Sequence, residues 1–143
     1  MNNKDIMFKE IDIIQSIIAR MWSNSFMIKW WTITLAVWII ALDKFNENNR
    51  MVLLWLSLFS IFVFWLLDAY YLQQEKLYRK LYNRIIKNRE KSNEYIFDMN
   101  TERVFGKNEC FVCVMFLKTV WPLYALLITF LIAFWYVNFI LVN

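Results

Sequence analysis

The feature that most constrains this chain is the junction at Asp68, where an uncharged apolar segment passes directly into a strongly basic one. No charged residue occurs from Met51 to Leu67. From Glu75 to Lys91, seven Lys and Arg residues stand against two Glu residues. An excess of Lys and Arg beside a membrane span marks the cytoplasmic side. The junction therefore predicts a span that continues as a basic cytoplasmic helix.

The composition places the whole chain in the same class. Hydrophobic residues make up 60% of the 143 residues and aromatic residues 20%, against roughly 45 to 50% apolar residues in a soluble domain. One Gly and one Pro argue against a β-sandwich or barrel, whose turns need both. The expected fold is an all-α membrane protein with a single domain.

The first 25 residues predict an amphipathic helix. Their apolar positions alternate between spacings of four and three, which is typical of a surface helix or a short coiled coil. These positions are Met7, Ile11, Ile14, Ile18 and Met21. Charged residues occupy the other side, so we expect the helix to lie on the membrane surface or to pack against a partner helix.

Three segments are apolar and long enough to cross a bilayer, although the first is short. They are residues 26–42, 51–72 and 119–142. The second corresponds to roughly 33 Å of helix and the third to roughly 36 Å. Residues 73–109 are predicted to form the cytoplasmic helix and a connector. The N-terminus is expected in the cytoplasm and the C-terminus on the opposite side.

Three charged residues at the ends of the spans are candidates for a permeation path: Asp68, Lys29 and Lys118. An acid at the inner end of a span needs water, a cation or a basic partner. In a ring of subunits, Asp68 would line a cation pathway. The alternative is that Asp68 pairs locally with Lys or Arg at headgroup depth, and that both lysines extend toward the membrane surface.

The basic segment after Asp68 supplies the candidate ligand-binding residues: Lys76, Arg79, Lys80, Arg84, Lys87 and Lys91. Most of them fall within about 80° of one another on a helix, with apolar and tyrosine side chains opposite. Clustered Lys and Arg neutralise phosphates, so this face suits a nucleotide or an oligonucleotide. The same face also fits a solvated surface that touches anionic lipid.

A channel function would require several copies of the chain, because three spans do not enclose a water-filled path. The expected contacts between copies lie on the two amphipathic segments: Ile11, Ile14, Ile18, Tyr78, Leu81 and Ile85. The spans contain no Gly, so close crossing of the GxxxG kind is excluded.

The sequence predicts no catalytic residue, no metal site and no cofactor. Without His, the chain lacks the Ser-His-Asp and Cys-His sets and the usual metal sites. Cys110 and Cys113 form a CxxC, but a structural zinc site needs four ligands. A redox role for this pair is the less favoured interpretation.

The run from Phe64 to Tyr82, FWLLDAYYLQQEKLYRKLY, resembles a segment of the SLATT-like small membrane proteins of bacterial defence loci. Those proteins are similar in having an N-terminal amphipathic helix, a tight pair of spans and a long charged helix leaving the second span. This chain adds a third span to that layout. The channel subunit of Hailong-type systems is a related possibility.

The resemblance implies an effector in the bacterial inner membrane that forms a pore or channel during phage infection. It also implies a nucleotide or oligonucleotide signal, made by a cognate nucleotidyltransferase or sensor protein, and a homo-oligomer that depolarises the cell. A different function fits the same sequence, namely a non-conducting membrane anchor or scaffold that recruits a cytoplasmic partner.

Overall fold

The computed structural model describes residues 3–43, 50–88, 101, 106 and 110–142. Four α-helices account for most of them: α1 (Asn3–Asp43), α2 (Arg50–Asn88), α3 (Phe111–Met115) and α4 (Trp121–Val142). The described part of the chain contains no strand, so the predicted all-α fold class is confirmed.

Helix α1 is continuous, whereas the sequence suggested an amphipathic helix over residues 1–25 followed by a separate span over 26–42. The physical reason is that no Gly or Pro interrupts the helix between Asn3 and Asp43. The N-terminal part of α1 packs along α2, as the contacts of Ile14 show.

Helix α2 carries the apolar segment and the basic segment in one piece, with no break at Asp68. Its 39 residues correspond to about 59 Å, and the 41 residues of α1 to about 62 Å. A bilayer has a hydrocarbon core of about 30 Å. About half of each helix therefore extends beyond any membrane that the apolar half crosses.

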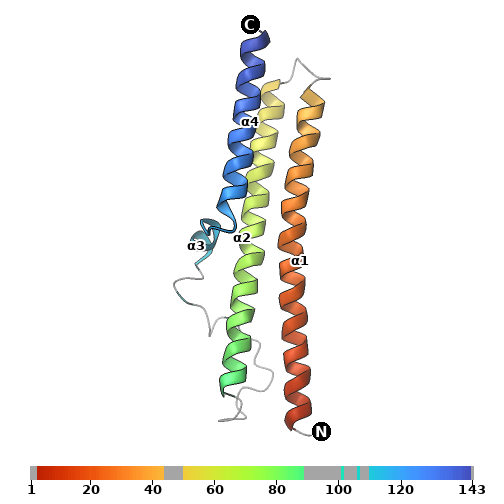
Figure 1. The fold of residues 1–143 in the computed structure, drawn as a ribbon, viewed down its shortest axis with the longest axis vertical. Coiled ribbons are helices and arrows are strands. Elements are labelled where there is room, and N and C mark those ends of the chain that lie inside the picture. Colours follow the sequence, from red (N-terminus) through yellow and green to blue (C-terminus); the bar gives the residue numbers. More distant parts are fainter. Residues whose placement is uncertain (1–2, 44–49, 89–100, 102–105, 107–109, 143) are drawn as a thin grey trace.

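Helices α1 and α2 form a long antiparallel pair, and α4 lies along the half of α2 that begins at Arg50 (Figure 1). The short helix α3 lies beside the middle of α2, just before α4 begins. A turn through residues 116–120 reverses the chain there, and Pro122 occupies the first turn of α4, where a missing N–H group costs no helical hydrogen bond.

Two apolar clusters hold the helices together, one in each half of the molecule. Ile61 of α2 packs with Val120, Tyr124, Leu131 and Trp135 in the half that contains α4. In the other half, Ile14 of α1 packs against Leu81 and Ile85 of α2. Each cluster buries large apolar side chains, and those of the second cluster lie on the apolar faces predicted for the two amphipathic segments.

The second cluster consists of residues expected at contacts between copies, and within the single chain they pack on one another. Contacts between copies stay a prediction. Ile14, Leu81 and Ile85 are almost fully buried within one chain, and Ile18 and Tyr78 pack against them. The two amphipathic segments lie side by side, and each buries the apolar face of the other. Ile11 is half-buried on α1.

Among the described residues, three helices are long and apolar enough to cross a membrane: α1, α2 and α4. Their outer surfaces carry large apolar side chains, including Trp30, Trp38, Trp55 and Phe59, each about two-thirds exposed. Water is a poor solvent for such a surface, and lipid is a suitable one.

Candidate functional site: a buried ion pair between the spanning helices

Asp68 lies at the centre of the molecule and is completely buried. It belongs to a series of inward positions on α2 spaced seven residues apart, Ile61, Asp68 and Glu75, all of which are buried. A seven-residue spacing keeps side chains on one seam of paired helices. The helix therefore directs the carboxylate of Asp68 toward its neighbours instead of toward lipid.

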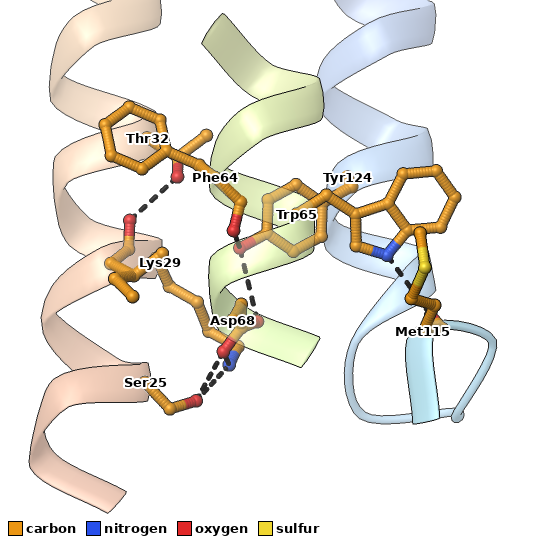
Figure 2. Close-up of polar contacts among 9 residues, drawn as sticks. Ser25, Lys29, Thr32, Phe64, Trp65, Asp68, Met115 and Tyr124 are labelled. Carbon is orange, nitrogen blue, oxygen red and sulfur yellow. Dashed lines mark hydrogen bonds and ion pairs between the residues drawn. The ribbon is translucent and has the colours of Figure 1, made fainter. Parts of the chain in front are cut away.

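Helix α1 supplies a cation and a hydroxyl to this carboxylate. Lys29 Nζ lies 2.7 Å from Asp68 Oδ1 and 2.9 Å from Ser25 Oγ. The hydroxyl of Ser25 in turn donates to the same Asp68 oxygen. Ser25 and Lys29 are one turn apart on α1, so both reach the carboxylate from one helix face (Figure 2).

Helix α4 supplies the third contact. The hydroxyl of Tyr124, which is fully buried, lies 3.2 Å from Asp68 Oδ2 and 3.4 Å from the carbonyl oxygen of Phe64. The carboxylate is the stronger acceptor and the closer one, so the Tyr124 hydroxyl donates its hydrogen bond mainly to Asp68 Oδ2. One carboxylate thus joins α1, α2 and α4, and we name Ser25, Lys29, Asp68 and Tyr124 the Asp68 cluster.

Trp65 fixes the start of α4 at the level of this cluster. Its indole N–H donates to the carbonyl oxygen of Met115 in α3, at 3.1 Å. Its ring stacks on Tyr124 with 6.0 Å between ring centroids and meets Phe116 edge to face at 5.7 Å. Figure 2 shows Trp65 beside Tyr124, on the side of the cluster away from α1.

Four polar side chains of α1 and α2 are buried, and we name them the polar seam: Ser25, Thr32, Ser57 and Asp68. Thr32 donates to the carbonyl oxygen of Ile28, and Ser57 to that of Leu54, each at 2.7 Å. Their protons are satisfied within their own helices. The hydroxyl oxygens nevertheless keep lone pairs, so the seam is wettable if the helices separate.

The charges of the Asp68 cluster balance, which explains how the carboxylate is buried. Asp68 is 0% exposed and the Lys29 side chain is 23% exposed. An isolated buried carboxylate is strongly unfavourable, whereas a paired one with two further hydrogen bonds is tolerated. The arrangement can hold helices together, or present a carboxylate to a cation when the pair separates.

Two of the three residues predicted for permeation therefore meet, and the third does not. Asp68 and Lys29 form an ion pair, which is the local pairing considered above as the alternative to a permeation path. Lys118 is exposed in the turn between α3 and α4. Lys118 therefore lies outside the Asp68 cluster.

The predicted ligand-binding residues occupy the half of α2 beyond Asp68. Arg79, Lys80 and Lys87 are exposed, and Lys76 and Arg84 are half-buried. Arg79 Nε donates to Glu75 Oε1 at 2.8 Å, one turn away. Lys91 lies outside the described residues.

Sequence reasoning missed Ser25 and Tyr124, since a serine and a tyrosine in helical segments carry no signal of their own. A signal for the Lys29–Asp68 pair does exist. The connection between α1 and α2 is short, so residues at similar distances from it lie at the same level of an antiparallel pair. Lys29 and Asp68 satisfy that condition.

The described residues contain no group of three or more His, Cys, Asp or Glu side chains that could hold a metal ion. Cys110 and Cys113 are exposed free thiols at the start of α3.

The fold and the site define the class of the protein: a helical membrane protein with three candidate spans and an ion pair buried between them. Comparisons with protein-family models, with curated proteins and with solved structures found no match to this chain. Its function is therefore argued from the geometry and the sequence.

Proposed function

We propose that this protein is a subunit of an oligomeric ion channel or pore in a bacterial inner membrane, with its N-terminus in the cytoplasm. The observation that carries the proposal is the polar seam with its buried Lys29–Asp68 pair. The outward faces of the same helices are apolar and suit lipid. Polar residues on the inward faces of apolar spans line the water-filled paths of channels.

In this proposal the single chain represents the closed form. Its three long helices pack directly on one another, so conduction needs several copies whose seams face a shared axis. Opening then requires Lys29 to separate from Asp68. In the assembly, the Asp68 residues of the copies form a ring of carboxylates, and such a ring favours the passage of cations.

The basic half of α2 is the proposed sensor. Lys76 lies eight residues from Asp68 on the same unbroken helix, or about 12 Å. A nucleotide or oligonucleotide bound to Lys76, Lys80, Arg84 and Lys87 would pull on α2 and transmit the displacement to the ion pair. A shift from 1:99 to 99:1 in favour of the open form needs about 5.5 kcal/mol of differential binding, which several phosphate contacts can supply.

The biological setting follows from the resemblance to SLATT-like proteins. A cognate nucleotidyltransferase or sensor protein would make the signal during phage infection, and ion flux would depolarise the cell. The charge pattern of α2, basic on one side of Asp68 and apolar on the other, agrees with a channel that reads a cytoplasmic anion.

The test is ion flux from liposomes that contain the purified protein, with a panel of cyclic and linear oligonucleotides added on the basic side. We expect at least one oligonucleotide to change the flux. Replacing Lys76, Lys80, Arg84 and Lys87 by Gln should abolish that response and leave the helical content unchanged. Lys9→Gln, which removes one exposed charge from α1, is the matched control and should respond normally.

A non-conducting anchor or scaffold is the second candidate, and one observation favours it. Asp68 has contacts from three side chains on two neighbouring helices, as a purely structural junction would. In a scaffold, the exposed basic residues would recruit a cytoplasmic partner directly. Folded, oligomeric protein that conducts under no condition, yet still retains a partner on membranes, would favour this function over the channel.

A further inference from the structure

A groove of about 530 Å³ lies between the N-terminal half of α1 and the C-terminal half of α2. It is open to the outside. Six of the residues that line it are Gln15, Ala19, Trp22, Arg79, Tyr82 and Asn83. The two walls therefore come from different helices, one with an aromatic residue and the other with a cation.

Arg79 is the charged group of this groove, and an ion pair with Glu75 orients its side chain. Its Nε donates to Glu75 Oε1 at 2.8 Å, and the Glu75 side chain is 9% exposed. The Arg79 side chain itself is 59% exposed. The fork of terminal nitrogens thus remains accessible, and a guanidinium fork matches the geometry of a phosphate.

Arg79 points toward the apolar half of α2, since it reaches back one turn to Glu75. Side chains of a helix lean toward its N-terminus, and Glu75 lies one turn nearer to Asp68 on α2. Arg79 is eleven residues beyond Asp68, or about 16 Å along the helix. A long side chain that leans back toward the spans reaches the headgroup layer of the leaflet at the inner end of the apolar segment.

The aromatic wall extends in the same direction. Trp22 and Phe26 are each 60% exposed and stack with 6.1 Å between ring centroids. Phe26 lies one turn closer than Trp22 to the apolar part of α1. Exposed Trp at this level is typical of the membrane interface, and an adjacent Phe offers an apolar surface to an acyl chain.

We propose that this groove binds the headgroup of an anionic phospholipid. Arg79 would hold the phosphate, the amides of Gln15 and Asn83 would bond headgroup hydroxyls, and Trp22 with Phe26 would contact the acyl chains. A lipid is favoured over a soluble phosphate because the groove joins a cation to an aromatic path that leads into the spans. The inference does not require the protein to conduct ions.

The experiment uses the full-length protein in a neutral detergent, titrated with dioctanoyl phosphatidylglycerol. Binding is followed by native mass spectrometry and by the shift in melting temperature. Dioctanoyl phosphatidylcholine, glycerol phosphate and inorganic phosphate are the comparison ligands. Arg79→Gln removes the phosphate contact. Ala19→Phe fills the groove from α1 and keeps the charge of Arg79. Arg20→Gln, the control, removes an exposed charge of α1 outside the groove.

We expect wild-type protein and Arg20→Gln to bind phosphatidylglycerol alike, and both groove variants to bind it at least about fivefold more weakly. Circular dichroism shows whether each variant keeps its helices. If Arg79→Gln does not fold, Ala19→Phe alone decides the outcome. Equal binding of phosphatidylcholine, or unchanged binding by a folded groove variant, would overturn the proposal. Equal stabilisation by inorganic phosphate would overturn the lipid as occupant.

Discussion

Replacing Lys29 by Met should destabilise the protein more than any other single change at the surface of α1. The substitution keeps the length and apolar stem of the side chain and removes the charge that Asp68 faces at 2.7 Å. Breaking a buried ion pair from one side costs about 3 to 5 kcal/mol. Because the Lys29 side chain is 23% exposed, we expect the lower end, about 3 kcal/mol.

The neutral double variant Lys29→Met/Asp68→Asn provides the decisive comparison. The side-chain amide that replaces the carboxylate would still accept a hydrogen bond from Ser25 or Tyr124, and no buried charge would remain. We therefore expect the double variant to lose only about 1 to 2 kcal/mol and to be more stable than Lys29→Met alone. The two substitutions should couple by about 2 kcal/mol or more.

The assay is reversible unfolding in mixed micelles, driven by sodium dodecyl sulfate and followed by circular dichroism and tryptophan fluorescence. Lys118→Met, which removes an exposed lysine outside the cluster, serves as the control and should change stability by less than about 0.5 kcal/mol. A Lys29→Met loss below about 1 kcal/mol, or a double variant whose loss equals the sum of the two single losses, would refute the reasoning.

Two further substitutions test the packing on either side of the pair. Tyr124→Phe removes one hydrogen bond to a carboxylate and should cost about 1.5 to 3 kcal/mol in the same unfolding assay, whereas Tyr136→Phe on the exposed side of α4 should cost less than about 0.5 kcal/mol. Ile14→Ala should cost about 2 to 4 kcal/mol and loosen the packing of the N-terminal half of α1 on the C-terminal half of α2, which would be measured as faster amide exchange in both segments. Its control is Ile13→Ala, since Ile13 is 40% exposed. A control that costs as much as its partner would contradict the burial on which each prediction rests.

The helices and their apolar segments were predictable, because a run without charge from Met51 to Leu67 has few alternatives to a span. The continuity of α1 was not recognised. A change from amphipathic to fully apolar composition marks where a membrane begins, but it does not end a helix that lacks Gly and Pro.

The partners of the inward-facing residues were harder to predict than the helices. An apolar seam at residues 11, 14 and 18 specifies that something packs there, but it does not say whether the partner is another copy or another segment. The structure shows α2 in that place. Similarly, Tyr124 reaches Asp68 only because the turn at 116–120 sets the level at which α4 begins.

The most direct test of the central claim is ion flux from liposomes, without any ligand, for variants that separate the buried pair. The account predicts that folded Lys29→Met and Asp68→Asn each conduct at least about tenfold faster than wild type. A tenfold change corresponds to a closed form that is less stable, relative to the open form, by about 1.4 kcal/mol. The reversed pair Lys29→Glu/Asp68→Lys should restore closure. Single variants that fold, assemble and conduct no more than wild type would contradict the claim that separating Lys29 from Asp68 opens the channel.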